Sequence, residues 1–283
     1  MIVLGISETH CATAAVLRDG AIVGCASEER FSRVKNDAGY PRRAIDALLA
    51  ELRLAASDID LVVLAGTRIP TYEWMNRVMR DEAYRNDYYG VRLDAPGRGL
   101  GRRARKLGAK LGLLDTAPGK SPLPREARFA IATDHLGLAA DRMRLVDHHA
   151  CHAASAYLGA PWGAEPALVL TNDNSGDGLC ATVSTGRDAS LVRHEATPSG
   201  PGSLGSFYTL VTVLLGMKAG EHEYKVMGLA PYADPRWSER AAAALQTVFE
   251  LAEDHPCRFA WKTRGAPYRA LLQATLGLRF DAV

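Results

Sequence analysis

Residues 2–26 read IVLGISETHCATAAVLRDGAIVGCA and predict three β-strands in succession. We expect these strands at Ile2–Ile6, Thr13–Leu17 and Ala21–Ala26. The dipeptide Asp19-Gly20 joins the second strand to the third, and it favours a tight hairpin because a type I′ turn needs positive φ at both central residues. The chain therefore begins with an antiparallel triplet of strands.

Beyond the triplet, helices and strands alternate. A helix opened by Pro41 is followed by a buried strand at Leu61–Ala65 and by a polar helical stretch over residues 70–114. A short strand at Arg142–Val146 comes next. This order predicts an α/β lobe with a mixed sheet, whose first three strands are antiparallel and whose later strands are parallel. The polar stretch carries a basic cluster, interpreted as a solvated helix face rather than a phosphate site: Arg98, Arg102, Arg103, Arg105, Lys106 and Lys110.

The opening pattern then returns. Strands are expected at Ala167–Thr171, Leu179–Thr185 and Leu191–Glu195, and the tripeptide at Cys11 recurs at Cys180. The repeat suggests two similar lobes, residues 1–165 and 166–283. The segments after the second triplet are expected to be helical and without further strands, so we expect a second lobe that is truncated: Leu204–Met217, Arg236–Glu253 and Tyr268–Leu278.

The composition is that of an ordinary soluble protein. The 283 residues are 47% hydrophobic and 23% charged, and the net charge is +2. This balance gives no electrostatic case for nucleic acid or a membrane as a partner. The five cysteines show no CxxC spacing and are interpreted as reduced thiols of a cytoplasmic protein.

Residues 147–157, DHHACHAASAY, place two histidines four residues apart at the start of an expected helix. Because positions i and i+4 share one helix face, His148 and His152 could bind the same metal ion. The alternative is that one histidine caps the helix and the other packs in the core. His149 lies on a different face and is expected to tolerate change better than either of these two histidines.

Two polar loops are candidates for chemistry. In residues 173–178, DNSGDG, the glycines would let backbone amides approach a phosphate, and Asp173 and Asp177 could hold a divalent ion or orient a hydroxyl. A plain polar turn is the alternative. In the first loop, His10 could donate to a phosphate or accept a proton, or it could simply be a surface histidine.

Five segments in this order resemble the amino-terminal region of carbamoyltransferases of the nodulation-factor and antibiotic-tailoring type: LGISETHCATAAVLRDG, SEERFSRVKND, DHHACHAASAY, NDNSGDG and SLGSFYTLVTVLLGMKAGEHEYKVMGLAPYADP. The resemblance implies an actin-like (ASKHA, Kae1-like), two-lobed fold. It also implies a YrdC-like domain that makes carbamoyladenylate from carbamoyl phosphate and ATP. The actin-like part would then pass the carbamoyl group to a hydroxyl of a small-molecule or glycan acceptor.

The resemblance also implies roles for individual residues. A divalent metal, of the iron type, would bind His148 and His152 together with a later aspartate, expected beyond Val283. The remaining candidates are catalytic residues, His10, Lys35, Asp173 and Asp177, and residues that bind the nucleotide or adenylate, Ser175, Gly176, Gly178, Glu223 and Lys225. Because the YrdC-like domain is absent, the chain alone is expected to be inactive and to need the missing carboxy-terminal region; an oligomer is possible.

Two other functions fit parts of the pattern. An actin-like sugar kinase or ATPase would share the lobes and paired loops but would leave the histidine pair unexplained. A non-catalytic metal-binding interaction module would use the histidines without the transfer chemistry.

Overall fold

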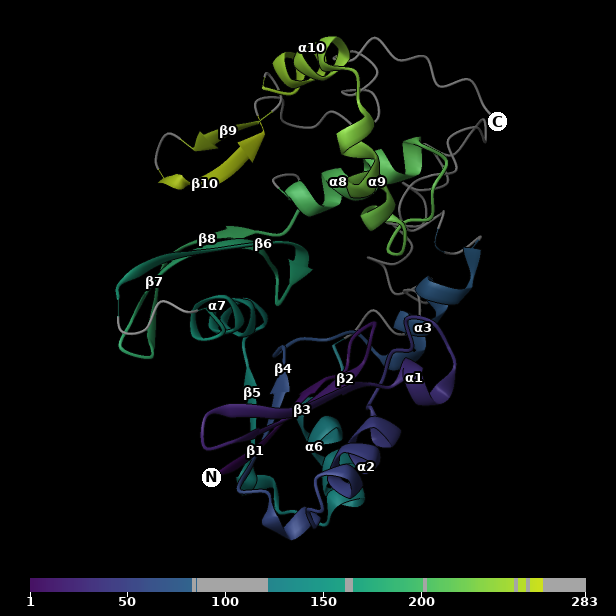
Figure 1. The fold of residues 1–283 in the computed structure, drawn as a ribbon, viewed down its shortest axis with the longest axis vertical. Helices are drawn as coiled ribbons and strands as arrows, with labels where there is room; N and C mark the ends of the chain where they lie inside the picture. Colours follow the sequence, from purple (N-terminus) through teal and green to yellow (C-terminus); the bar gives the residue numbers. More distant parts are fainter. Residues whose placement is uncertain are drawn as a thin grey trace, which may run out of the picture. The chain divides into compact units, whose positions relative to one another are not determined.

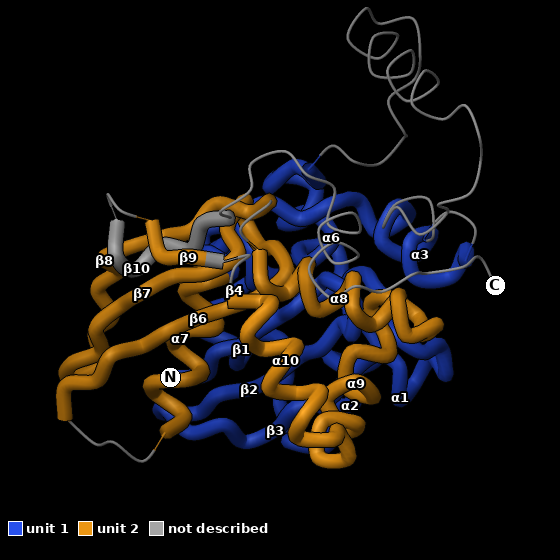
Figure 2. Tube along the Cα trace, turned by 90° about the horizontal axis from the view of Figure 1, so that it is seen from above, with its two compact units in different colours: residues 1–148 blue, residues 149–283 orange. Residues whose placement is uncertain are grey.

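The computed structural model describes residues 1–82, 85, 122–160, 165–200, 203–246, 249–252 and 255–261. The chain divides into two compact units, Met1–His148 and His149–Val283 (Figure 2). This division falls within one helix, whereas the repeated strand triplet begins at Ala167. The basic cluster between Arg98 and Lys110 and the helix expected at Tyr268–Leu278 lie outside the described residues.

Unit 1 is built on a five-stranded mixed sheet in the order β3-β2-β1-β4-β5 (Figure 1). The first three strands pair antiparallel, and β4 and β5 continue the sheet in parallel from β1. The strands are β1 (Ile2–Ser7), β2 (Thr13–Arg18), β3 (Ala21–Ser27), β4 (Leu61–Ala65) and β5 (Met143–Val146). This is the mixed sheet that the sequence predicts for the first lobe.

The core of unit 1 lies between this sheet and two helices, α2 (Arg42–Glu51) and α6 (Arg125–Leu136). Alternate residues of β1, β2 and β4 are buried, as the period of two in a strand requires. They pack against Ile45 and Leu48 of α2 and Phe129 of α6. The other short elements are α1 (Glu29–Ser32), η1 (Ala56–Asp58), α3 (Tyr72–Arg80) and η2 (Ala140–Arg142).

Unit 2 contains a second antiparallel triplet in the order β6-β7-β8, which confirms the predicted repeat of the strand triplet. Its strands are β6 (Ala167–Gly176), β7 (Leu179–Arg187) and β8 (Ser190–Pro198). Helix α7 (His148–Leu158) packs on β6 (Figure 1), because Ala153 and Tyr157 bury their side chains against Val169.

The rest of unit 2 departs from the sequence prediction. The elements are α8 (Leu204–Leu214), α9 (Glu223–Leu229), η3 (Ala230–Tyr232), α10 (Pro235–Leu245), β9 (Phe249–Ala252) and β10 (His255–Trp261). The prediction of one helix over Arg236–Glu253, with no later strands, is therefore wrong. Alternation of Phe249 and Leu251 with Glu250 suits a strand, and the antiparallel pairing with β10 fixes this conformation. In the described part of the chain, no helix combines the length and apolar character needed to cross a bilayer.

The hairpins of the two triplets share one turn geometry. Asp19 and Gly20 have φ of 51° and 86°, and Asp188 and Ala189 have φ of 47° and 61°. Both pairs therefore occupy the left-handed region that a type I′ turn requires. Alanine, unlike glycine, is strained there.

We expect the Ala189→Gly replacement to raise the free energy of unfolding by about 0.5–1 kcal/mol, since it removes left-handed strain. The reverse change, Gly20→Ala, is expected to lower stability by a similar amount, because nothing within 4 Å would touch the new methyl group and only the backbone is strained. Urea denaturation of both variants measures the effect. Changes of the same sign in the two variants would contradict this assignment.

Candidate metal centre

Helix α7 brings the two predicted histidine ligands together. His148 is its first residue, and His152 follows one turn later on the same face. The opposite side of the helix is fixed against strand β7 by Tyr157, whose ring lies so close to Gly186 that a Cβ there would approach it to 2.6 Å. A buried anchor thus leaves the histidine face open, and the His152 side chain is 51% exposed.

Strand β6 brings a carboxylate to the same place. The predicted loop over residues 173–178 is mostly strand, because β6 extends to Gly176 and only Asp177 and Gly178 form the turn. The register shifts between Asn172 and Gly176. Asp173 lies in this bulge, and a bulge commonly redirects a side chain towards a site.

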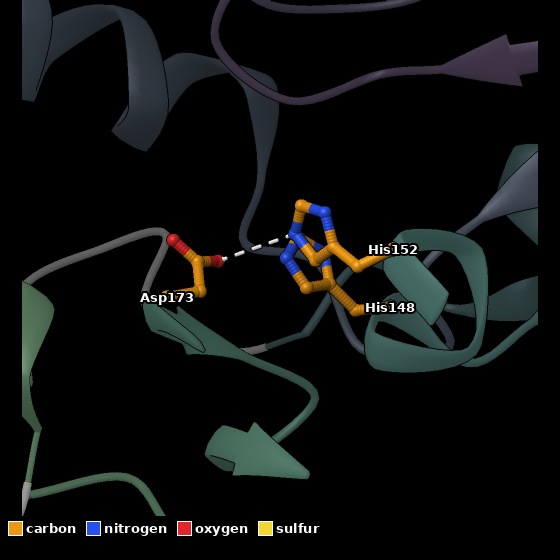
Figure 3. A group of neighbouring side chains, drawn as sticks. All are labelled: His148, His152 and Asp173. Carbon is orange, nitrogen blue, oxygen red and sulfur yellow. Dashed lines mark ion pairs between the residues drawn. The ribbon is translucent and has the colours of Figure 1, made fainter. Parts of the chain in front are cut away.

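His148, His152 and Asp173 form a cluster whose ligand atoms all lie within 4.8 Å of one another (Figure 3). The Nε2 atom of His152 is 3.7 Å from Oδ2 of Asp173. Two atoms bound to one ion at roughly 2.0–2.2 Å can be at most about 4.4 Å apart, so small side-chain rotations would complete a ligand set. Two histidines and one carboxylate are the donors of the facial triad that binds ferrous iron and leaves coordination positions open.

The cluster groups Asp173 with the histidine pair, which the sequence reasoning did not do. Asp173 was predicted to hold a divalent ion or to orient a hydroxyl, and the third ligand of the histidines' metal was expected beyond Val283. The available signal was an acidic residue near the end of a strand, but a register shift is not visible in the sequence. The residues that this chain contains can supply three ligands by themselves.

His149 has a structural environment. Its side chain is fully buried, and Nδ1 lies 2.7 Å from Oγ1 of Thr171. Thr171 in turn lies 2.7 Å from Oγ1 of Thr182, so the contact joins α7, β6 and β7. That His149 tolerates change better than His148 and His152 in metal binding and transfer stays a prediction, but its burial indicates a separate role in stability.

We therefore expect His149→Ala to lower the free energy of unfolding by about 1–3 kcal/mol, because the change removes a fully buried ring together with its hydrogen bond to Thr171. Thermal denaturation measures the loss. His194→Ala is the control, because His194 is exposed on β8 and bonds only the half-buried Thr185 among the contacts identified for it. Equal stability of the two variants would contradict a structural role for His149.

The remaining residues of the β6–β7 hairpin, Ser175, Gly176 and Gly178, have local partners. Oγ of Ser175 lies 2.9 Å from Oγ of Ser199, and Gly176 pairs with Leu179. The carbonyl of Gly178 accepts a bond from the Ser199 amide. Their binding of an adenylate remains a prediction, as does the role of Asp177.

The candidates of unit 1 lie on loops around its sheet. His10 is exposed. Lys35 is 72% exposed and donates to Glu29 over 3.1 Å, a bond that raises the pKa of the lysine. The Asn36 amide and then Lys35 lower the pKa of Glu29. Lys35 is thus held as a cation beside its partner.

Glu223 and Lys225 belong to α9 and have partners within their own turn. Glu223 accepts a bond from the Gly220 amide over 2.8 Å, and Nζ of Lys225 lies 3.0 Å from Nε2 of His222. Nδ1 of His222 accepts a bond from the Lys218 amide. The polar groups of this segment therefore support its local fold, and their contact with a nucleotide stays a prediction.

One buried polar network gave no sequence signal. Glu8 and Arg128 are both 0% exposed, and Nε of Arg128 donates to Glu8 over 2.7 Å. The other guanidinium nitrogens donate to the carbonyls of Gly66 and Ala65 at the end of β4. Tyr72 donates its hydroxyl to Glu8, and burial together with this carboxylate raises the pKa of Tyr72.

Fold and site together define a mixed α/β protein with a repeated strand triplet and a candidate centre of two histidines and one carboxylate. The chain belongs to the family described as carbamoyltransferase N-terminus, whose model matches residues 2–273.

Two relatives illustrate this membership. The Synechocystis protein sll1178, described as uncharacterised, is 32% identical over 257 residues, which cover 89% of this chain and 37% of that protein. The nodulation protein NolNO of Sinorhizobium fredii is 29% identical over 226 residues, covering 80% of this chain and 28% of that protein. The chain thus spans about a third of the length of these relatives.

Among solved structures, YeaZ from Pseudomonas aeruginosa is similar to 71% of this chain, and the match covers 68% of YeaZ. The TM-score is 0.33 and the sequence identity is 14%. So loose an overlap adds nothing to the fold assignment, which follows from the strand order of the two triplets.

Proposed function

We propose that this chain is the metal-binding part of an O-carbamoyltransferase, which transfers a carbamoyl group to a hydroxyl of a small-molecule or glycan acceptor. The observation that carries the proposal is the cluster of His148, His152 and Asp173 in a chain of the carbamoyltransferase N-terminus family. A sugar kinase or ATPase of the same fold class has no need of such a cluster.

The proposed donor is carbamoyladenylate, made from carbamoyl phosphate and ATP in a separate YrdC-like domain. The acceptor oxygen bonds to the carbamoyl carbon, the bond from that carbon to the phosphate oxygen breaks, and AMP leaves with the electron pair. The hydroxyl proton passes to a base. His148, His152 and Asp173 would hold the divalent ion, which supplies Lewis-acid polarisation of the carbonyl when it is bound.

The other candidates have proposed roles in binding and proton transfer. Lys35, held as a cation by Glu29, suits a contact to phosphate oxygens. His10 is exposed, and its imidazole could accept the proton of the acceptor hydroxyl. We propose a cytoplasmic location, where ATP and carbamoyl phosphate are available.

The test uses the whole protein with ferrous iron, a hydroxylated acceptor and isotopically labelled carbamoyl phosphate. We expect a labelled carbamoyl ester only when ATP and carbamoyl phosphate are both present, with release of AMP. Phosphorylation of the acceptor by ATP alone would instead establish the kinase. Metal binding without turnover of any hydroxylated acceptor would support the interaction module.

A further inference from the structure

We propose that Gly205, in the first turn of helix α8, is a positioning residue that holds Asp173 in place for the metal. This inference rests on the proposed metal centre. Gly205 is 32 residues from Asp173 in sequence and does not belong to the ligand cluster. Its contribution comes from how closely it lets α8 approach strand β6.

The approach of α8 to β6 is closer than any other residue would allow. A Cβ placed on Gly205 would lie 2.5 Å from the amide nitrogen of Asn174 and 2.7 Å from the carbonyl carbon of Asp173. Both are backbone atoms, so no side chain could rotate to relieve the clash. Any larger residue at this position must move β6 and α8 apart at Asp173, the proposed ligand.

Ser203 and Ser206, at the start of α8, both hydrogen-bond to Asn174 of β6. Ser203 caps α8, and its fully buried hydroxyl bonds to the Asn174 carbonyl over 2.8 Å. The same hydroxyl accepts a bond from the Ser206 amide over 3.0 Å. Ser206 donates its own hydroxyl to the side-chain oxygen of Asn174. The first turn of α8 is thereby bonded to the residue that follows Asp173.

The strand needs this support because its ladder is interrupted here. Asn172 pairs with Ala181 and Gly176 pairs with Leu179, so residues 173–175 are opposite Cys180 alone. An irregular segment of this kind is free to bend in more than one direction. Contact with α8 selects one direction, and the carboxylate of Asp173 then lies 3.7 Å from Nε2 of His152.

The experiment measures binding of Co²⁺ to the 283-residue chain through the visible spectrum of the bound ion. We expect Gly205→Ala to weaken binding by about 10–100-fold, the usual effect of disturbing a partner of a metal ligand. Gly228→Ala is the matched control and should leave affinity unchanged, since Gly228 lies in α9 with nothing within 4 Å of the added methyl group. Alanine favours helices more than glycine does, so loss of helix propensity cannot explain a defect.

A double-mutant cycle separates positioning from a general loss of structure. If Gly205 acts through Asp173, Gly205→Ala should cause no further loss of affinity in a chain that already carries Asp173→Ala. Additive losses in the folded double variant would overturn the inference. If Gly205→Ala does not fold, Ser206→Ala replaces it in the cycle and is expected to behave in the same way, more weakly.

Two further outcomes are distinguishable. Suppose that the unaltered chain binds Co²⁺ and that His148→Ala and His152→Ala lose this binding. If Gly205→Ala then binds Co²⁺ as well as the unaltered chain does, the positioning role is refuted while the metal centre stands. If the unaltered chain binds no Co²⁺, or if the two histidine variants bind it equally well, the metal centre fails and the positioning role fails with it.

Discussion

Arg128→Ala is expected to lower the free energy of unfolding by about 3–5 kcal/mol, the cost of removing one partner from a buried ion pair. The change would leave the carboxylate of Glu8 buried and without its cation, and it would remove the donors to the Gly66 and Ala65 carbonyls. Unit 1 would then lose the connection between the end of β1, the end of β4 and helix α6. Urea denaturation measures the loss.

Arg42→Ala is the matched control for this prediction. Arg42 pairs with Asp134 at 3.3 Å, but the two side chains are 49% and 80% exposed. An exposed pair of this kind contributes about 0–1 kcal/mol. If the two arginine variants unfolded at the same urea concentration, the buried network would not stabilise the fold as we infer.

The largest effect on activity is expected from the metal centre. We expect the loss of any one ligand to weaken retention of the divalent ion more than about 100-fold and to abolish carbamoyl transfer, in His148→Ala, His152→Ala and Asp173→Ala alike. This loss exceeds the effect expected from a residue that only contacts a ligand. Metal analysis after gel filtration and the transfer assay measure the two losses.

Formation of carbamoyladenylate should survive in these variants, because it is proposed to occur in another domain. His194→Ala provides the control, since this exposed histidine of unit 2 lies on β8 and outside the cluster. A folded ligand variant that kept both its ion and its transfer rate would remove the residue concerned from the site. Loss of adenylate formation together with transfer would show that the assigned role is too narrow.

Local signals made the strand triplets predictable. Asp19-Gly20 predicts a hairpin, because a type I′ turn needs positive φ at both central residues and few residue pairs adopt it. The alternation of Leu4 and Ile6 with smaller neighbours indicates one buried face of the strand. The spacing of His148 and His152 was sufficient to place them on one helix face. Each of these inferences depends on residues close together in sequence.

Contacts between distant residues were not predictable in this way. Glu8 and Arg128 are separated by 120 residues, and neither position shows an unusual local pattern. Asp173 lies near the histidines at a register shift in β6, beside the close approach of Gly205, and neither feature is marked by a local pattern in the sequence. The predicted helix over Arg236–Glu253 was wrong beyond Leu245 for a similar reason, since the strand at Phe249–Ala252 depends on pairing with β10.

Helix α7 begins at His148, so the proposed metal centre lies at the amino end of a helix and within its electrostatic field. The amino end of a helix carries a partial positive charge, equivalent to roughly half an elementary charge, which opposes a cation and favours an anion. The carboxylate of Asp173 would help to offset that field for a divalent ion held there. Ion and helix end together would still leave a net positive region that attracts phosphate-bearing donors, and the rate of donor capture should therefore fall as ionic strength rises.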